Sequence, residues 1–502
     1  MPKPIIYFRA DGNSQIGLGH IVRSLALADM LCDNFDCIFL VQTPSEALQN
    51  QITEKHQLIA FENTDDYINE AKNIAEKLLH NAHITVLDGY NFKTEYQKII
   101  RSSGCKLVCI DDLHAWHFVA DVVINHAGGI HPSKYSCEPY TKLCLGTEYA
   151  LLRQPFLKAA QQLRKREDLS KVFICFGGAD THNLTEKTIK ACLEVDRLTE
   201  IHVVTGSAYT EQKALKKIVS TNKKLYFYQN LSAREMAALM AQCDLAVAPA
   251  SSISYELCCV GIGLVLGTYA ANQQGIFNFL IENQLAIPLG GFLEITQAGL
   301  TCLIENMLPE VVLKQIAGQK HYFQTPRLPK VFEKLLLAQN VETAKASIDD
   351  MELYFDWAND KETRKNAINS EPIIFEQHKQ WFQTKLSDTN TFLYKFTYQD
   401  VSLGQVRFEL IDKHLEIGYS VAPQFRGKGF GEIIMQMALK ALVGHYDENI
   451  SNLPDKIIAL VKPDNQASTK VFEHLNFEFT GMQTIKGVNL NQYQKPIYRV
   501  YK

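Results

Sequence analysis

The chain of 502 residues lacks the features that would place it in a membrane or on nucleic acid. No apolar run approaches the roughly 20 residues that a membrane-spanning helix needs. The apolar stretch at the start, Met1–Phe8, is too short for a secretory signal. The formal net charge is only −4, so the composition predicts no general affinity for nucleic acid or anionic lipid. We therefore expect a cytoplasmic globular protein, with neither nucleic acid nor a membrane as its partner.

Cysteine is absent from the last third of the chain and shows no ligand-like spacing elsewhere. All 12 cysteines lie between Cys32 and Cys302, without a Cys-x-x-Cys pair. Most have apolar neighbours, as Cys109 and Cys175 do, which is typical of buried, reduced thiols. The sequence therefore predicts no zinc site and no other metal site.

Length and pattern predict about three domains, which we place at residues 1–160, 161–345 and 346–502. In the first two, short apolar strands alternate with helical stretches, and the charged segment 163–168 is interpreted as a linker. This alternation predicts two Rossmann-like parallel sheets with a ligand between them. The expected strands are 5–8, 37–41, 84–88, 107–111 and 122–125, then 172–176, 201–205, 225–228, 245–248 and 264–266. A helical segment from Val331 to about Ala346 would close the pair.

The last domain is predicted to be α+β. Segments 392–398, 404–410 and 415–421 alternate like antiparallel strands. A glycine loop, a helix at 432–443, a strand at 457–461 and another helix follow.

The loop after the first strand is the most informative segment. It ends in Gly17-x-Gly19-His20 where a helical pattern begins. The first amides of a helix have no partner within the helix and can bind an anion. The positive end of the helix dipole favours a neutral imidazole, so His20 is a candidate general base.

Further polar residues follow the predicted strands of both units. Any one of them could be a turn former or a helix cap, but together they favour a site. Serines at 251–254 open a helix that could hold a pyrophosphate, and Glu256 could accept two hydrogen bonds from a ribose diol. The groups are Asp88-Gly89-Tyr90, Asp111-Asp112, Asn125-His126, Gly177-Gly178, Ser252 to Glu256, and Asn272-Gln273.

These segments, in this order, resemble the UDP-sugar hydrolase family of pseudaminic-acid biosynthesis, a relative of the two-domain GT-B glycosyltransferases. The resemblance covers roughly residues 4 to 325 and also includes Asp111-Asp112-Leu113 and Tyr149 to Arg153. It implies a GT-B arrangement in which water attacks C1 of a UDP-2,4-diacetamido-2,4,6-trideoxy-altrose and UDP leaves without a metal ion. His20 would be the general base. The implied UDP-sugar contacts are Asp11, Gly17, Gly19, Arg23, Asp88, Tyr90, Arg153, Gly177, Gly178, Ser252, Ser254, Glu256, Asn272 and Gln273. The chain departs from the family at Ala248-Pro249-Ala250, where glycines are usual.

The segment from Gln424 to Gly431 is a second glycine loop, with basic residues among its glycines. Its amides would wrap a pyrophosphate, and together with 461–477 it resembles the GNAT acetyltransferases. The resemblance implies acetyl-CoA as co-substrate. The implied contacts are Val421, Gln424, Arg426, Gly427, Lys428, Gly429, Gly431, Asn465, Ser468 and Phe472.

The GNAT-like segment departs from the family pattern at two positions. Phe472 stands where many members have a tyrosine that acts as general acid, and Asn476 replaces a glycine. Tyr493 and Tyr498 are alternative acids, and Glu409 or Glu416 could be the base. The aromatic segment before the strands, with Trp357, Arg364, His378 and Trp381, could form the acceptor pocket or a structural cluster.

The hypothesis is a bifunctional enzyme that acetylates a UDP-linked 4-amino sugar and then hydrolyses the product. One alternative is a glycosyltransferase that passes the sugar to an acceptor hydroxyl. The second alternative concerns the GNAT-like domain, which could serve only for binding or docking, or could acetylate another acceptor.

Overall fold

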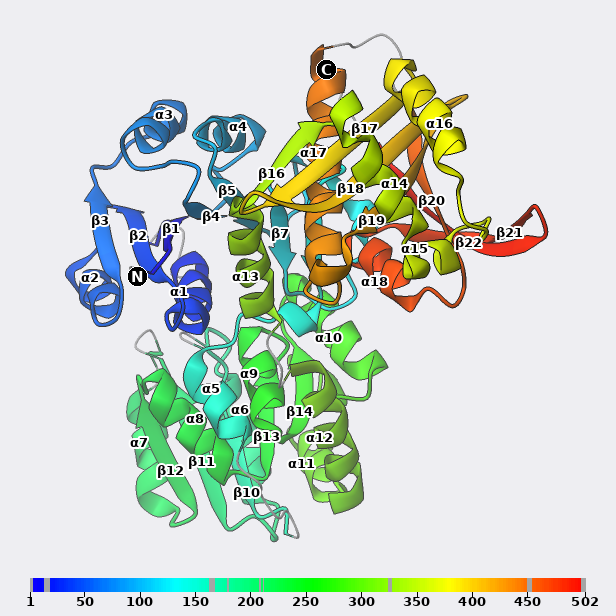
Figure 1. The fold of residues 1–502 in the computed structure, drawn as a ribbon. Helices are drawn as coiled ribbons and strands as arrows, with labels where there is room; N and C mark the ends of the chain where they lie inside the picture. The colour runs from blue at the N-terminus through cyan, green and yellow to red at the C-terminus, as the bar shows by residue number, and fades with distance from the viewer. Residues whose placement is uncertain are drawn as a thin grey trace.

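The computed structural model of the protein contains three large sheets that follow one another along the described chain (Figure 1). The structure describes residues 3–12, 19–161, 168–177, 180–206, 209–210, 212–323, 327–448 and 454–497. Gly17, Gly178, Tyr498 and most of the predicted linker lie outside these ranges, as does the side chain of Asn272.

The first sheet is parallel, in the order β3-β2-β1-β4-β5-β7-β9. Its strands are β1 (Ile5–Ala10), β2 (Asp36–Gln42), β3 (Gln57–Phe61), β4 (Ile84–Asp88), β5 (Lys106–Ile110), β7 (Val122–Asn125) and β9 (Lys142–Leu145). The helices are α1 (Gly19–Leu31), α2 (Glu46–Thr53), α3 (Tyr67–Lys77) and α4 (Thr94–Ser102). A small ladder of β6 (His117–Phe118) and β8 (Ser136–Cys137) and the 3₁₀ turns η1 (Pro132–Lys134) and η2 (Thr147–Tyr149) complete this part.

The second sheet is also parallel, in the order β12-β11-β10-β13-β14-β15. Its strands are β10 (Lys171–Ile174), β11 (Glu200–Thr205), β12 (Leu225–Gln229), β13 (Leu245–Pro249), β14 (Gly263–Thr268) and β15 (Ile287–Gly291). The helices and turn are α5 (Gln154–Ala160), α6 (Leu184–Leu193), α7 (Gln212–Thr221), α8 (Ala233–Gln242), α9 (Ser252–Val260), η3 (Ala271–Gln273), α10 (Gln274–Glu282), α11 (Gln297–Glu305), α12 (Pro309–Phe323) and α13 (Leu328–Gln339).

Both parallel sheets place their switch points where the strand order reverses, between β1 and β4 and between β10 and β13. Ligands of such sheets bind beyond the carboxyl ends of the strands at these points. The central strands form because they are apolar and buried on both faces, as β4 is along its whole length. Helix α13 returns to the first sheet, where the rings of Phe332 and Phe35 are 6.4 Å apart (Figure 1).

The third sheet is mixed, in the order β16-β17-β18-β19-β20-β22-β21. Its strands are β16 (Val341–Lys345), β17 (Thr391–Tyr398), β18 (Val401–Ile411), β19 (His414–Val421), β20 (Lys456–Val461), β21 (Glu478–Ile485) and β22 (Val488–Pro496). The helices and turns are η4 (Ile348–Asp350), α14 (Met351–Asn359), α15 (Lys361–Asn366), α16 (Phe375–Ser387), η5 (Pro423–Phe425), α17 (Phe430–Glu448) and α18 (Gln466–His474).

One helix expectation is wrong. The segment predicted to be helical from Val331 to Ala346 is helical only to Gln339, and Val341–Lys345 is strand β16. Val341 is buried, and β16 pairs antiparallel with β17 along its whole length. The ladder of hydrogen bonds with β17 therefore overrides helix propensity at this position.

The third domain docks on the first through α17. The carboxylate of Glu432 is buried and pairs with Lys142 of β9 and Lys334 of α13, and it also lies 3.3 Å from Nδ1 of His474. Burial by itself would raise the pKa of Glu432, but these cations lower it well below its usual range. Gln436 donates to the Asp121 carbonyl at 2.8 Å.

Asn476 has a structural role at the same boundary. Its φ is +60°, a left-handed conformation that asparagine tolerates better than most residues. Its side-chain oxygen accepts a hydrogen bond of 3.0 Å from the Leu143 amide of β9. Asparagine in place of glycine thus keeps the turn and adds a bond between domains.

Replacing Glu432 by alanine is expected to destabilise the chain, because the Lys142 ammonium would stay buried without a counter-ion. Removing one partner of a buried pair costs roughly 3–5 kcal/mol. The measurement is the first denaturant-unfolding transition. Glu95→Ala is the control, since Glu95 pairs with Lys98 on the surface and its loss should cost at most about 1 kcal/mol. Equal midpoints for the two variants would contradict the prediction.

None of the described helices is long and apolar enough to cross a bilayer. Ten of the 12 cysteines are buried, and burial raises the pKa of Cys144, for example, to about 12. These thiols therefore stay protonated at neutral pH.

Candidate functional site

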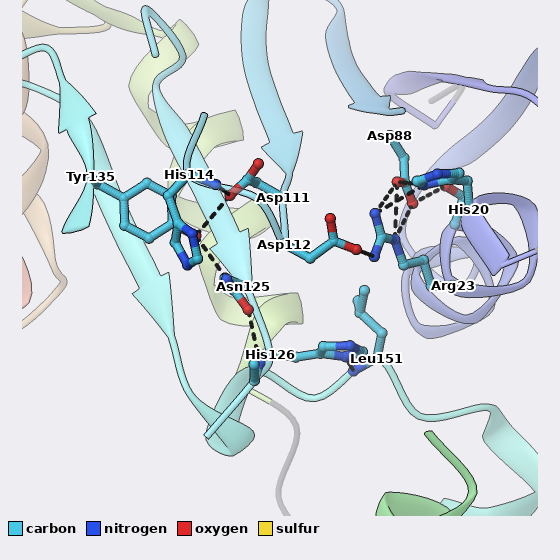
Figure 2. A network of polar contacts seen from close by, with 12 residues as sticks. His20, Arg23, Asp88, Asp111, Asp112, His114, Asn125, His126, Tyr135 and Leu151 are labelled. Atoms are coloured by element: carbon cyan, nitrogen blue, oxygen red, sulfur yellow. Dashed lines mark hydrogen bonds and ion pairs between the residues drawn. The ribbon is translucent and has the colours of Figure 1, made fainter. Parts of the chain in front are cut away.

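His20 and Asp88 meet at the switch point of the first sheet (Figure 2). His20 is the second residue of α1, and Asp88 is the last residue of β4. Nδ1 of His20 lies 2.7 Å from Oδ1 of Asp88. Asp88 is fully buried and also accepts hydrogen bonds from Arg23, the shortest at 2.6 Å, and from Ser24 at 3.1 Å.

The charge on Asp88 sets the tautomer of His20. Burial by itself would raise the pKa of Asp88, but the Arg23 charge and the bonds from His20 and Arg23 lower it. Nδ1 of His20 has two neighbours, the Asp88 carboxylate at 2.7 Å, which only accepts, and Nη2 of Arg23 at 3.0 Å, which only donates. The contact with the carboxylate is the shorter one, so we assign the ring proton to Nδ1. Within the described part of the chain nothing hydrogen-bonds Nε2, which is therefore left to take a proton. Tyr90, nearly half exposed, lies edge-on to the imidazole with ring centroids 4.7 Å apart.

Arg23 links two strand ends. Besides Asp88, its guanidinium donates to Asp112, which follows β5, at 2.7 Å. Burial would lower the pKa of Arg23, but the two carboxylates raise it further above its usual value. Arg23 was predicted as a substrate contact, and the structure places it between two carboxylates that hold it beside His20.

A second polar group lies at the ends of β5 and β7 (Figure 2). The Tyr135 hydroxyl donates to Asp111 at 3.0 Å and accepts from Asn125 at 2.8 Å. Sequence reasoning missed Tyr135, because it lies in the η1–β8 excursion and not after a sheet strand.

His126, after β7, is a neutral donor. Burial and the Arg23 charge lower the pKa of His126 to about 4, and its Nδ1 accepts from the Leu151 amide at 3.2 Å. Nε2 therefore carries the proton. Its ring lies edge-on to Tyr255 of α9 at 5.8 Å, and the Tyr255 hydroxyl accepts from the Gly128 amide at 3.2 Å. The carboxyl edge of the first sheet thus adjoins the first turns of α9.

The two anion sites predicted in the second unit differ in how their amides are used. The loop at Gly177, with φ +82°, leads to Asp180, whose carboxylate accepts from the Leu184 and Thr185 amides at 2.9 and 2.7 Å. The start of α6 is therefore already capped. At α9, the N-cap Ser251 makes no side-chain cap bond. Helix α9 is thus the better place for a diphosphate.

Four of the remaining predicted contacts of the second unit have partners within the protein, namely Arg153, Ser254, Glu256 and Gln273. Ser252 is exposed, whereas Ser254 is buried and donates to the Ser251 carbonyl at 2.6 Å. Arg153 pairs with Glu256 at 2.7 Å, and burial raises the pKa of Glu256 despite that cation. Gln273 accepts from the Tyr269 amide at 2.9 Å.

In the first unit, two predicted contacts stand at the two ends of the glycine loop, Asp11 after β1 and Gly19 at the start of α1. Asp11 accepts from the buried Arg9 at 2.6 Å and from the Gln42 amide at 2.9 Å. Gly19 opens α1, and nothing lies within 4 Å of where its Cβ would be.

The second glycine loop has the conformation that a backbone anion cradle needs. Gly427 and Gly429 have φ of +74° and +84°. No atom lies within 4 Å of a Cβ at Gly427, so a diphosphate can approach its backbone. Arg426 is held by Asp360 at 2.6 Å and by the Val421 carbonyl at 2.9 Å, and Lys428 donates to the Gln424 carbonyl at 2.8 Å.

The helix after β20 is capped by Asn465, which accepts from the Ser468 amide at 3.1 Å. Of the two candidate bases, Glu409 is paired with Lys385 at 3.1 Å and with Arg407 at 2.8 Å. The contact of Glu416 is longer: its Oε1 lies 4.0 Å from Nε2 of His414.

The aromatic segment forms a packed cluster over β17. Trp357 and Phe382 are buried there, and Trp381 packs at its edge. Nε2 of His378 donates to the Met351 carbonyl at 3.2 Å, and Arg364 donates to the Ala358 carbonyl at 2.5 Å.

Comparison with known proteins finds relatives of two different kinds for two parts of the chain. The profile of the acetyltransferase (GNAT) domain matches residues 344–478. UDP-2,4-diacetamido-2,4,6-trideoxy-beta-L-altropyranose hydrolase of Campylobacter jejuni is 25% identical over 281 residues, which cover 55% of this chain and 96% of that protein. Spore coat polysaccharide biosynthesis protein SpsG of Bacillus subtilis is 25% identical over 285 residues, 56% of this chain and 82% of that protein.

An uncharacterised protein of Methanocaldococcus jannaschii resembles nearly the whole chain, at 24% identity over 489 residues, which cover 94% of this chain and 96% of that protein. Among solved structures, MurG of Acinetobacter baumannii aligns with 67% of this chain and 99% of its own, at 15% identity and a TM-score of 0.47. Spermidine N-acetyltransferase of Vibrio cholerae, with CoA and spermine, aligns with 32% of this chain and 96% of its own, at 19% identity and a TM-score of 0.28.

The predicted fold class is confirmed in its sheets: two domains with parallel, Rossmann-like sheets precede an α+β domain that matches the GNAT profile. The N-terminal region is related to the Campylobacter hydrolase and to SpsG at about 25% identity, and an acetyltransferase domain follows it.

Proposed function

We propose that the chain is a bifunctional nucleotide-sugar enzyme of pseudaminic-acid type biosynthesis. Its GNAT domain acetylates the 4-amino group of a UDP-linked amino sugar with acetyl-CoA. Its first two domains then hydrolyse the resulting UDP-2,4-diacetamido-2,4,6-trideoxy-altrose to the free sugar and UDP. The observation that carries the hydrolase half is the pair of His20 and Asp88 at the switch point that adjoins α9.

In the proposed hydrolysis, Nε2 of His20 takes a proton from the water that attacks C1, and the C1–O bond to UDP breaks. Asp88 holds the imidazole in the required tautomer and stabilises its protonated form, as the carboxylate of a Ser-His-Asp triad does. The backbone amides in the first turn of α9, which has no side-chain cap, receive the diphosphate. Glu256 accepts from the ribose once the nucleotide displaces Arg153. Because UDP is a good leaving group, the reaction needs chiefly a base for the water and hydrogen-bond donors for the diphosphate.

In the proposed acetyl transfer, the loop from Gln424 to Gly431 binds the pyrophosphate of acetyl-CoA through its amides. The positive φ angles at Gly427 and Gly429 and the open space at Gly427 support this placement.

The test is mass spectrometry of the products from a UDP-4-amino-4,6-dideoxy-N-acetyl sugar with acetyl-CoA. We expect a mass gain of one acetyl group, followed by release of UDP without any sugar acceptor. UDP release only when an acceptor is added would indicate a glycosyltransferase instead. If acetyl-CoA is not consumed, the GNAT domain is a binding module or uses another acceptor.

A further inference from the structure

Acetyl transfer leaves a proton donor unassigned in this chain. The departing CoA thiolate needs a proton, because an ordinary thiol has a pKa of about 8.5. Phe472, at the position where the GNAT resemblance expects a tyrosine acid, is buried and has no proton to give. A donor for this reaction must therefore come from another element near Phe472.

Tyr419 of β19 brings a hydroxyl to the same face of α18. Its ring lies edge-on to the Phe472 ring, with centroids 6.0 Å apart. The Tyr419 hydroxyl is 3.1 Å from Oγ of Ser468. Ser468 and Phe472 are four residues apart on α18, so their side chains share one helix face. The hydroxyl thus lies one helical turn before Phe472.

The same hydroxyl also borders the start of α17. A Cβ added at Gly431 would be 3.7 Å from the Tyr419 oxygen and 3.4 Å from its ring. Gly431 is the second residue of α17 and the last of the glycine loop. Tyr419 therefore lies between the first turns of α17 and α18, next to the proposed pyrophosphate site.

The sheet opens beside Tyr419. Strands β19 and β20 pair in parallel from His414 with Lys456 to Ile417 with Ala459, and the pairing ends there. Tyr419 is two residues beyond the last paired residue of β19. A thioester tethered to a pyrophosphate at the glycine loop can reach the carbonyl and amide groups that this opening leaves unpaired.

We propose that Tyr419 donates the proton to the departing CoA thiolate, with Ser468 holding its hydroxyl. The inference rests on the proposed acetyl transfer. The amine attacks the thioester carbonyl, the C–N bond forms, and the C–S bond breaks with its electron pair on sulfur. Sulfur takes the Tyr419 proton. The amine releases its proton to solvent, and the phenolate regains one from solvent.

Two further observations agree with this role. Burial raises the pKa of Tyr419, so the phenol keeps its proton at neutral pH until the thiolate forms. Tyr493 of β22 is another tyrosine beside Phe472. Its ring is stacked on the Phe472 ring, with centroids 6.2 Å apart, and also packs against Phe479. It lies on the far side of β20 from β19, away from the opening.

The experiment measures CoA release by the full-length enzyme with acetyl-CoA and the UDP-4-amino sugar. For Tyr419→Phe we expect kcat to fall about 100-fold, as for other general acids, with the KM for acetyl-CoA within about threefold of wild type. The rate of UDP release from the pre-formed diacetamido substrate should be unchanged in this variant. This rate is the control that shows the variant to be folded. The double variant Tyr419→Phe, Phe472→Tyr should have a kcat at least about tenfold higher than Tyr419→Phe alone.

A wild-type kcat in the Tyr419→Phe variant would overturn this inference and leave the proposed acetyl transfer standing. A fall of kcat in Tyr493→Phe but not in Tyr419→Phe would overturn it in favour of Tyr493. A wild-type enzyme that releases no CoA would overturn the proposed acetyl transfer and this inference with it.

Discussion

Replacing His20 by alanine is expected to lower kcat for UDP release by about 10²–10⁴-fold, the usual contribution of a general base. The imidazole is the only described group at this switch point that combines a fixed tautomer with a nitrogen left to accept a proton. Alanine removes that acceptor and leaves Asp88 paired with Arg23 and Ser24. The fold should therefore persist.

The measurement is steady-state UDP release, together with calorimetric titration of UDP. Because His20 acts on water and not on the nucleotide, the Kd for UDP should stay within about threefold of wild type. His131→Ala is the matched control, since His131 is exposed on the same domain and its side chain hydrogen-bonds only Ser133 among the described residues. Wild-type turnover in His20→Ala would disprove the assignment of the base.

Replacing Asp88 by asparagine is expected to have a similar or larger effect, about 10⁴-fold in kcat, by analogy with the triad carboxylate. The asparagine amide can donate to Nδ1 of His20, which moves the ring proton to Nε2 and removes the base. Arg23 also loses its buried counter-ion, which costs roughly 3–5 kcal/mol of stability. Asp112→Asn is the comparison, since Asp112 pairs with the same Arg23 from a partly exposed position. We expect it to lower kcat less than tenfold.

The lowered pKa of Asp88 also predicts a pH dependence of stability. A carboxylate with a depressed pKa in the folded state stabilises the protein above its unfolded pKa of about 3.9. That stabilisation is lost as the pH falls toward the folded value. Wild type should therefore unfold at a higher temperature than Asp88→Asn at pH 7, and the difference should shrink below about pH 4. A difference that grows with acid would contradict the ion-pair interpretation.

The central strands were predictable because they are buried on both faces and therefore consist of apolar runs, as β4 and β13 do. Several strands that the sequence analysis missed lie at sheet edges, where exposed positions interrupt the apolar pattern. β15 alternates half-buried residues with exposed ones, and β3 and β16 also mix exposed residues with buried or half-buried ones. Their pairing depends on the neighbouring strand more than on their own composition.

For the candidate site, local sequence was enough to choose His20, since the strand, glycine loop and helix that present it are contiguous. Asp88 and Arg23 were also chosen, as substrate contacts, which stays a prediction. Their contacts with His20 were not predicted, because they join separate elements. Tyr419 was missed altogether. Its sequence context is an ordinary alternating strand, and nothing in it indicates that the hydroxyl reaches α18.

By itself, the sequence determined the central strands of the parallel sheets and the chemical groups that the chain carries: two glycine loops, a histidine at a helix start, and a phenylalanine in place of an acid. The tertiary structure decided what those groups do. His20 and Asp88 are 68 residues apart, and only the parallel order of β1 and β4 brings them to 2.7 Å. Tyr419 and Ser468, 49 residues apart, meet only through the crossover of α17. Tautomers and proton donors depend on such partners, because a hydrogen bond forms only over a few ångströms that chain spacing does not specify.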